Sequence, residues 1–202
     1  HASVRSLRPA APGTNPSGDL TLTLPANIGS DRRVLAVNGS GNLEFIYPCG
    51  YGHFKAYLSS ANTVTNNGEE TIELATVDGA NGQGNAQSWF VNSGDYKYTP
   101  QVAGVYFFYV QCFWRADTDN KAIKFRARIR KNGSDYIADN YAGIDDQYGA
   151  FAHDASATVY MNGSSDYIQF RASSHSSDGT DGVLEGGYEQ YTYGLGYLLE
   201  AA

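Results

Sequence analysis

The segment 105–114, Val-Tyr-Phe-Phe-Tyr-Val-Gln-Cys-Phe-Trp, is the feature that most restricts how this 202-residue chain can fold. Successive side chains of a strand point to opposite faces of its sheet. Both faces of this strand are therefore apolar and aromatic: Val105, Phe107, Tyr109 and Phe113 lie on one, and Tyr106, Phe108, Val110, Cys112 and Trp114 on the other. The segment 191–199 behaves alike, with Tyr191, Tyr193, Leu195, Tyr197 and Leu199 on one face and Gly194, Gly196 and Leu198 on the other.

Other segments have one wet face. In the segment 123–130, Lys and Arg alternate with Ile, Phe and Ala, which is typical of a strand with one face on a core and one in water. Turn signals such as Asn132-Gly133 and Asn162-Gly163 separate the apolar runs, and no segment keeps a helical period over three turns. The pattern predicts an all-β jelly-roll sandwich.

A strand with two apolar faces needs two covers. A two-sheet sandwich buries only the inner face of each sheet, and each aromatic left in water forgoes roughly 1.5–3 kcal/mol. The simplest second cover is another copy of the chain, and the alternative is a loop or the N-terminal extension. We therefore expect an oligomer.

The composition changes along the chain. We expect residues 1–18 to be a flexible leader, because Pro, Gly and small residues follow one another there without a period. Residues 19–48 predict a short β-hairpin segment with its turn at Asn38-Gly39, too small to bury a core of its own. Residues 49–202 hold the remaining strands and form the predicted main domain.

Charge and composition exclude several classes of function. A net charge of −7 argues against a nucleic-acid partner, which requires a basic field. No apolar run reaches 18 residues, so we expect no membrane insertion. Two cysteines cannot supply a four-ligand metal site, and we expect no metal, no other cofactor and no catalytic centre. Cys49 and Cys112 fit two buried thiols better than a disulfide, although the sequence leaves both open.

Several motifs resemble one family. The segment 92–108 (Asn-Ser-Gly-Asp-Tyr-Lys-Tyr-Thr-Pro, then Gly-Val-Tyr-Phe-Phe) resembles the signature of C1q-like heads of the C1q/TNF trimeric jelly rolls. The ending Tyr193-Gly194-Leu195-Gly196-Tyr197-Leu198-Leu199 resembles their closing strand, and the resemblance covers about residues 52–200. It implies a homotrimer. We assign six side chains of the two-faced strands to the trimer interface: Tyr106, Phe108, Val110, Trp114, Tyr193 and Tyr197.

No collagen repeat precedes the head. Instead, the segment from Leu20 to Pro48 resembles the shaft modules of bacteriophage tail fibres. The resemblance implies a viral protein for host attachment, located on the virion and extracellular: a tail-fibre or appendage tip. Its partners would be further copies of itself, other virion appendage proteins, and a bacterial surface glycan or outer-membrane receptor.

The segment from Ser134 to Asp154 predicts a long loop rich in tyrosine and acidic residues, a mixture that suits sugar binding. We name five candidate receptor-binding residues there: Tyr136, Tyr141, Asp145, Asp146 and Tyr148. The same acidic residues leave a Ca²⁺ site open. The basic stripe of residues 121–131 allows two interpretations, attraction of an anionic surface sugar or ion pairs with acidic loops across strands.

Three functions compete. The sequence favours non-enzymatic attachment to a receptor, in which three weak sites on one trimer gain avidity. One alternative is a structural knob that holds the fibre together without binding a receptor. The other is a polysaccharide-degrading enzyme, which requires paired carboxylates that the sequence does not clearly offer.

Overall fold

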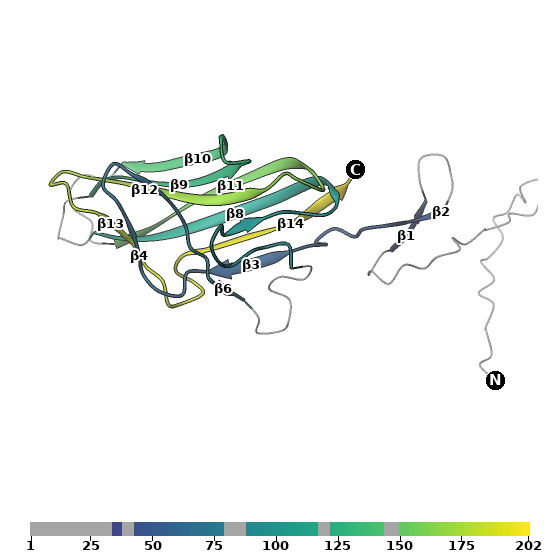
Figure 1. Ribbon diagram of the computed structural model, residues 1–202, viewed down its shortest axis with the longest axis horizontal. Coiled ribbons are helices and arrows are strands. Elements are labelled where there is room, and N and C mark those ends of the chain that lie inside the picture. The colour runs from purple at the N-terminus through teal and green to yellow at the C-terminus, as the bar shows by residue number, and fades with distance from the viewer. Residues whose placement is uncertain (1–33, 38–42, 79–87, 117–121, 144–149) are drawn as a thin grey trace, which may run out of the picture. The chain divides into compact units, whose positions relative to one another are not determined.

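The computed structural model describes residues 34–37, 43–78, 88–116, 122–143 and 150–202 (Figure 1). The chain divides into two compact units, residues 1–46 and residues 47–202. In the first unit, β1 (Val34–Val37) and β2 (Leu43–Ile46) form the predicted antiparallel hairpin, with Val37 opposite Leu43. The predicted leader and the turn at Asn38-Gly39 lie outside the described residues.

The second unit is a sandwich of two sheets (Figure 1). The first has the order β10 (Asp135–Gly143), β9 (Ala122–Lys131), β12 (Ile168–Ser176), β5 (Glu69–Thr71), and β7 (Lys97–Tyr98) also pairs with β12. The second has the order β4 (Asn62–Val64), β13 (Gly182–Leu184), β8 (Ala103–Ala116), β14 (Tyr193–Ala201), β3 (Phe54–Tyr57), β6 (Thr76–Val77). The strand β11 (Ala150–Asn162) pairs with β8 from Ala103 to Arg115.

All ladders between these strands are antiparallel, and the described residues contain no helix, which confirms the all-β prediction. From β4 to β13, the chain changes sheet at every connection except the one between β9 and β10. Among the described residues, no helix offers the length and apolarity that a membrane span requires.

The inner face of β8 fills the core of a single chain. Its five side chains have no exposed surface: Tyr106, Phe108, Val110, Cys112 and Trp114. They meet the inner faces of β9 and β12, as in the contact of Trp114 with Phe125, whose ring centroids are 4.4 Å apart. A side chain without exposed surface cannot touch a second copy. The assignment of Tyr106, Phe108, Val110 and Trp114 to a trimer interface was therefore wrong, because it took the core-facing side of the strand for the outer one.

Two glycines of β14 face this core. A Cβ atom at Gly194 would lie 2.5 Å from the Phe170 ring, and one at Gly196 would overlap the ring of Phe108 and approach Phe54 to 2.9 Å. No side chain larger than hydrogen fits at either position. The alternation Tyr-Gly-Leu-Gly-Tyr thus places large side chains outward and leaves inward room for aromatic rings from the neighbouring strand and the opposite sheet.

The turn at Asn132-Gly133 joins β9 to β10, as predicted. Asn132 and Gly133 have φ of 52° and 75°, the left-handed region that these residue types tolerate best. Buried Asp166 fastens the turn: its carboxylate accepts a hydrogen bond from the Asn132 amide at 2.8 Å and pairs with Lys131 at 2.8 Å. The cost of burial is outweighed by these bonds and by one from the backbone of Asn162, so that the pKa of Asp166 lies below its ordinary value.

Candidate functional site

The outer face of the seven-stranded sheet is aromatic. We define the aromatic face by side chains of three adjacent strands and one residue just before β14: Val105, Phe107, Tyr109, Phe113, Tyr160, Tyr191, Tyr193, Leu195 and Tyr197. Phe107 lies opposite Tyr197 in the ladder between β8 and β14, with ring centroids 5.5 Å apart. Phe113 stacks on Tyr191 at 4.9 Å. All of these side chains keep some exposed surface, so the aromatic face is open to solvent in a single chain.

A hollow of about 580 Å³ interrupts the aromatic face beside β3. Lys55, Gln111, Tyr193 and Leu195 line it together with Glu189 and Gln190. Lys55 pairs with Asp78 at 2.8 Å and lies 5.6 Å from the centre of the Tyr193 ring. Partial burial, with the nearby Tyr193 hydroxyl, raises the pKa of Tyr109, so its hydroxyl stays protonated over the physiological range.

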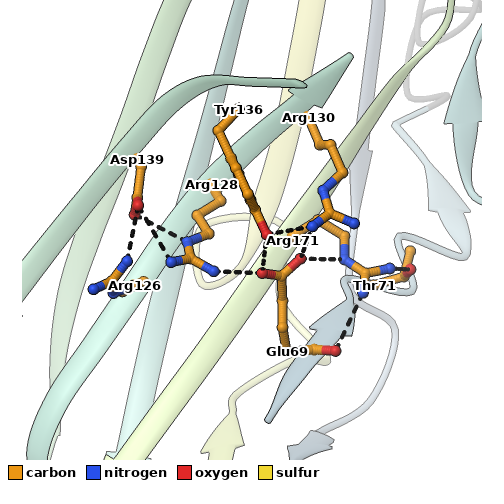
Figure 2. Close-up of polar contacts among 8 residues, drawn as sticks. All are labelled: Glu69, Thr71, Arg126, Arg128, Arg130, Tyr136, Asp139 and Arg171. Carbon is orange, nitrogen blue, oxygen red and sulfur yellow. Dashed lines mark hydrogen bonds and ion pairs between the residues drawn. The ribbon is translucent and has the colours of Figure 1, made fainter. Parts of the chain in front are cut away.

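The outer face of the five-stranded sheet carries charges instead. Figure 2 shows Glu69 of β5 at the centre of a cluster that we call the Glu69 cluster: Glu69, Thr71, Arg126, Arg128, Arg130, Tyr136, Asp139 and Arg171. The Glu69 carboxylate accepts bonds from Arg128, from Arg171 at 2.9 Å and from the Tyr136 hydroxyl at 2.6 Å. Arg130 lies 3.3 Å from it.

A second carboxylate completes the cluster. Asp139 of β10 lies opposite Arg128 and binds it at 2.9 Å, and it also pairs with Arg126 at 2.8 Å. Tyr136 lies between two guanidinium groups, 4.7 Å from Arg128 and 4.5 Å from Arg130, measured to its ring centre. Aromatic faces attract cations at such distances.

The electrostatics of the cluster follow from these contacts. Partial burial raises the pKa of Glu69, but the bonds from Tyr136 and Arg171 and the charges of Arg130 and Arg128 outweigh it, so the pKa lies below its ordinary value. The pKa of Asp139 is lowered in the same way, because Arg128 and Arg126 outweigh its burial. Both carboxylates are therefore charged at neutral pH.

The structure changes the interpretation of the predicted receptor loop. Residues 135–143 form β10, so Tyr136 and Tyr141 belong to a strand rather than to a long loop, and Tyr141 lies opposite Arg126. Tyr136 is half exposed and tied into the Glu69 cluster. The other candidates, Asp145, Asp146 and Tyr148, lie outside the described residues. The assignment of the five residues to a receptor site stays a prediction.

The arginines of the basic stripe form the predicted ion pairs across strands, but their carboxylate partners lie on β5 and β10 and not in acidic loops. Arg126 and Arg128 pair with Asp139, and Arg128 and Arg130 with Glu69. Sequence reasoning missed Glu69 and Arg171. The alternation of Gln169, Arg171, Ser173 and His175 with apolar residues was the signal for a second wet strand face.

The remaining candidates are simple to place. Cys49 and Cys112 are free thiols, and Cys112 is buried as expected whereas Cys49 is exposed. Burial raises the pKa of Cys112 far above its ordinary value, which keeps the thiol protonated. In the part of the chain that the structure describes, no three His, Cys, Asp or Glu side chains gather as metal ligands.

Comparison with known proteins bears on the fold. No protein-family model matches the sequence, and no curated protein matches it significantly. The structure is similar to Eiger TNF from S. frugiperda, with a TM-score of 0.54 and 12% identity over 77% of this chain and 96% of that chain. The fold is a TNF-like jelly roll. This confirms the predicted fold class.

Two further structures are similar at lower scores. Murine APRIL has a TM-score of 0.48 with 10% identity, covering 73% of this chain and 99% of that chain. The globular domain of zebrafish complement 1qA protein has a TM-score of 0.46 with 9% identity, covering 75% and 99%. At such identities the likeness concerns the fold alone.

Proposed function

We propose that residues 47–202 form a self-associating attachment head without enzymatic activity, in which the aromatic faces of three copies meet. The observation that supports this proposal is the aromatic face. Its rings lie on the outer side of three adjacent strands, and a contiguous apolar patch on a folded chain is typical of a protein–protein interface.

The aromatic face is suited to burial against a copy of itself. Its side chains already pack in pairs, such as Phe107 with Tyr197 and Tyr109 with Tyr193, so that little rotamer freedom remains to be lost on association. Aromatic residues are also enriched in the buried centre of protein interfaces. Three-fold association is what the resemblance to trimeric C1q/TNF heads implies.

Light scattering after size-exclusion chromatography tests the association. The wild-type chain should elute with three times the mass of one chain at micromolar concentration. Phe107→Glu and Tyr197→Glu should give folded monomers, because a carboxylate at the centre of a dry interface is costly. Ser134→Glu adds the same charge at an exposed turn and should stay trimeric. A monomeric or dimeric wild type would overturn the proposal.

The finer part of the proposal is the context: the tip of a bacteriophage tail fibre or virion appendage that binds a bacterial surface receptor. The support for it is the resemblance of residues 20–48 to phage shaft modules, and the tyrosine and acidic residues of the segment 134–154. Three such sites on one trimer would act together, so each is allowed to be weak.

Staining a panel of bacteria with the fluorescent protein tests this context. The double variant Tyr141→Ala, Tyr148→Ala should stain the host far less than the wild type while staying trimeric. Tyr167→Ala removes one partly exposed tyrosine just before β12 and should stain normally. A stable trimer that stains no strain would favour the structural knob, and turnover of purified capsule would favour the enzyme.

A further inference from the structure

A pocket of about 460 Å³ lies beside the Glu69 cluster on the outer face of the five-stranded sheet. Its lining includes Asn67, Lys124, Arg126, Arg128, Ser173 and His175. We call it the Lys124 pocket. Its three cations, Lys124, Arg126 and Arg128, belong to the basic stripe of residues 121–131, for which the sequence left the attraction of an anionic sugar open.

The register of the strands explains why the sheet is hollow here. Lys124 lies opposite His175, Arg126 opposite Ser173, and Arg128 opposite Arg171. Arg171 fills its own position, since it reaches Glu69 and Thr71. One pair along the strand, the small side chain of Ser173 leaves the corresponding position open, because Glu69, which lies opposite it on β5, extends towards Arg128 and Arg171.

The wall opposite β9 is a turn rather than a strand. The β5 ladder begins at Glu69, and before it Gly68 donates to the carbonyl of Thr65 at 2.8 Å. The turn is fixed to the sheet, because the Asn67 amide donates to Ser174 at 2.9 Å and Asn66 accepts from the backbone of Ser176 at 2.8 Å. The pocket is therefore bounded by anchored backbone on one side and by long cations on the other.

The charge of this region is opposite to that of the whole chain. The ion pairs in Figure 2 set four arginines against two carboxylates, and Lys124 adds a further cation at the pocket. The net charge of the chain is −7. Positive charge is thus concentrated locally, and a paired guanidinium still carries its full charge. The one carboxylate of the pocket lining, Glu69, is directed at Arg128 and Arg171.

The chemistry of the lining selects a ligand class. Guanidinium and ammonium groups bind sulfate, phosphate and carboxylate oxygens through charge-assisted hydrogen bonds. Ser173 and Asn67 add neutral groups that suit sugar hydroxyls, and the volume is that of a small-ligand site. His175 also lines the pocket, and its buried Nδ1 atom has no hydrogen-bond partner among the described residues.

We propose that the Lys124 pocket binds an oxyanion carried on a sugar, so that the receptor is an acidic glycan. The inference rests on the proposed attachment function, for which it names the ligand class and a site. The ligand lies against Lys124 and Arg126 with its anionic group, and its sugar ring occupies the space above Ser173.

Titration calorimetry of the full chain tests this with four forms of one oligosaccharide: maltohexaose unmodified, sulfated, phosphorylated, and oxidised to carry carboxylates. At low salt the anionic forms should bind and the unmodified form should not, and higher salt should weaken binding at least tenfold. The anionic form that binds tightest identifies the oxyanion. Equal binding of the unmodified form, or no binding of any anionic form, would overturn the proposal.

Variants locate the site. Lys124→Gln and Arg126→Gln should each weaken the tightest form about tenfold, as expected for one charge-assisted bond. Ser173→Leu removes no charge but fills the pocket and should abolish binding. Lys97→Gln removes one cation from the neighbouring β7 and should change affinity less than twofold. Unchanged affinity of Ser173→Leu, with its fold intact by circular dichroism, would place the anion elsewhere.

The outcome is independent of self-association. A soluble hexasaccharide titrates one pocket at a time. A monomeric chain that still binds it would contradict the proposed trimer but would support the proposed ligand of the Lys124 pocket. A trimer that stains bacteria but binds no anionic form would support the attachment function and contradict the role of the Lys124 pocket in it.

Discussion

On the outer side of β8 and β14, aromatic rings meet one another across the strands, whereas the outer side of β9 and β12 carries arginines that meet two carboxylates. Both sheets use the same alternation, with every second residue in one common core. The charged face is satisfied within one chain, because Glu69 and Asp139 are shared among several cations. The aromatic face is not, because pairing of rings on an open surface leaves apolar area in water. This difference is the reason why the proposed self-association is assigned to the aromatic face and not to the charged face.

The largest effect on stability is expected from a comparison of the two sides of β8, the core side and the aromatic face. Phe108→Ala should lower the free energy of unfolding by about 3–5 kcal/mol, because the ring has no exposed surface and its loss leaves a cavity. Phe107→Ala, one residue away on the outer side, should cost about 1 kcal/mol or less in the dissociated chain. Denaturant unfolding at low protein concentration measures both. Equal losses would mean that the two faces are not distinct.

The next effect concerns the centre of the charged face. Glu69→Gln should lower the free energy of unfolding by about 1–3 kcal/mol, because several cations lose their shared, mostly buried carboxylate. Its neighbour Glu70 offers a matched control: Glu70→Gln removes the same charge, but Glu70 accepts only a 3.4 Å bond from Thr65 in the described contacts. The control should change stability by less than about 0.5 kcal/mol. A similar loss in both would show that charge number, and not the shared site, matters.

Tyr136 allows the hydroxyl and the ring to be separated. Tyr136→Phe should cost about 1 kcal/mol, since it removes the donor to Glu69 and the acceptor for Arg130 but keeps the ring between the guanidiniums. Tyr136→Leu should cost more, because the attraction between ring and cations is lost as well. Thermal and denaturant unfolding of the two variants compare these contributions. If the leucine variant were the more stable one, the ring would not contribute.

The smallest effect is expected in mild acid. The pKa values of Glu69 and Asp139 are lower in the folded chain than in the unfolded chain, so their stabilisation is complete at neutral pH and is lost as protons bind at lower pH. Between pH 7 and pH 4, we expect the free energy of unfolding to fall by about 1 kcal/mol or less from these groups, given ordinary carboxyl pKa values near 4. Glu69→Gln should flatten this slope. A slope that the variant leaves unchanged would assign it to other carboxylates.

Sequence alone determined the local rules of this protein. Alternation of two residue classes predicts strands, Asn132-Gly133 predicts a turn with left-handed backbone, and Tyr-Gly-Leu-Gly-Tyr predicts a strand with one bulky face. These patterns depend on backbone geometry and on nearest neighbours in the chain, so they can be interpreted without a fold. These patterns were sufficient to predict the all-β jelly roll and the solvent-exposed face of β9.

Only the tertiary structure decided which face is which. A period of two shows that Phe107 and Phe108 point in opposite directions, but not which direction is inward when both faces are aromatic. It also cannot show that Glu69 lies beside Arg128 and Arg171, because contacts between residues so far apart in the chain depend on the order and register of strands. For the same reason Tyr136, predicted in a loop, lies on a strand whose pairing with β9 places it between two arginines.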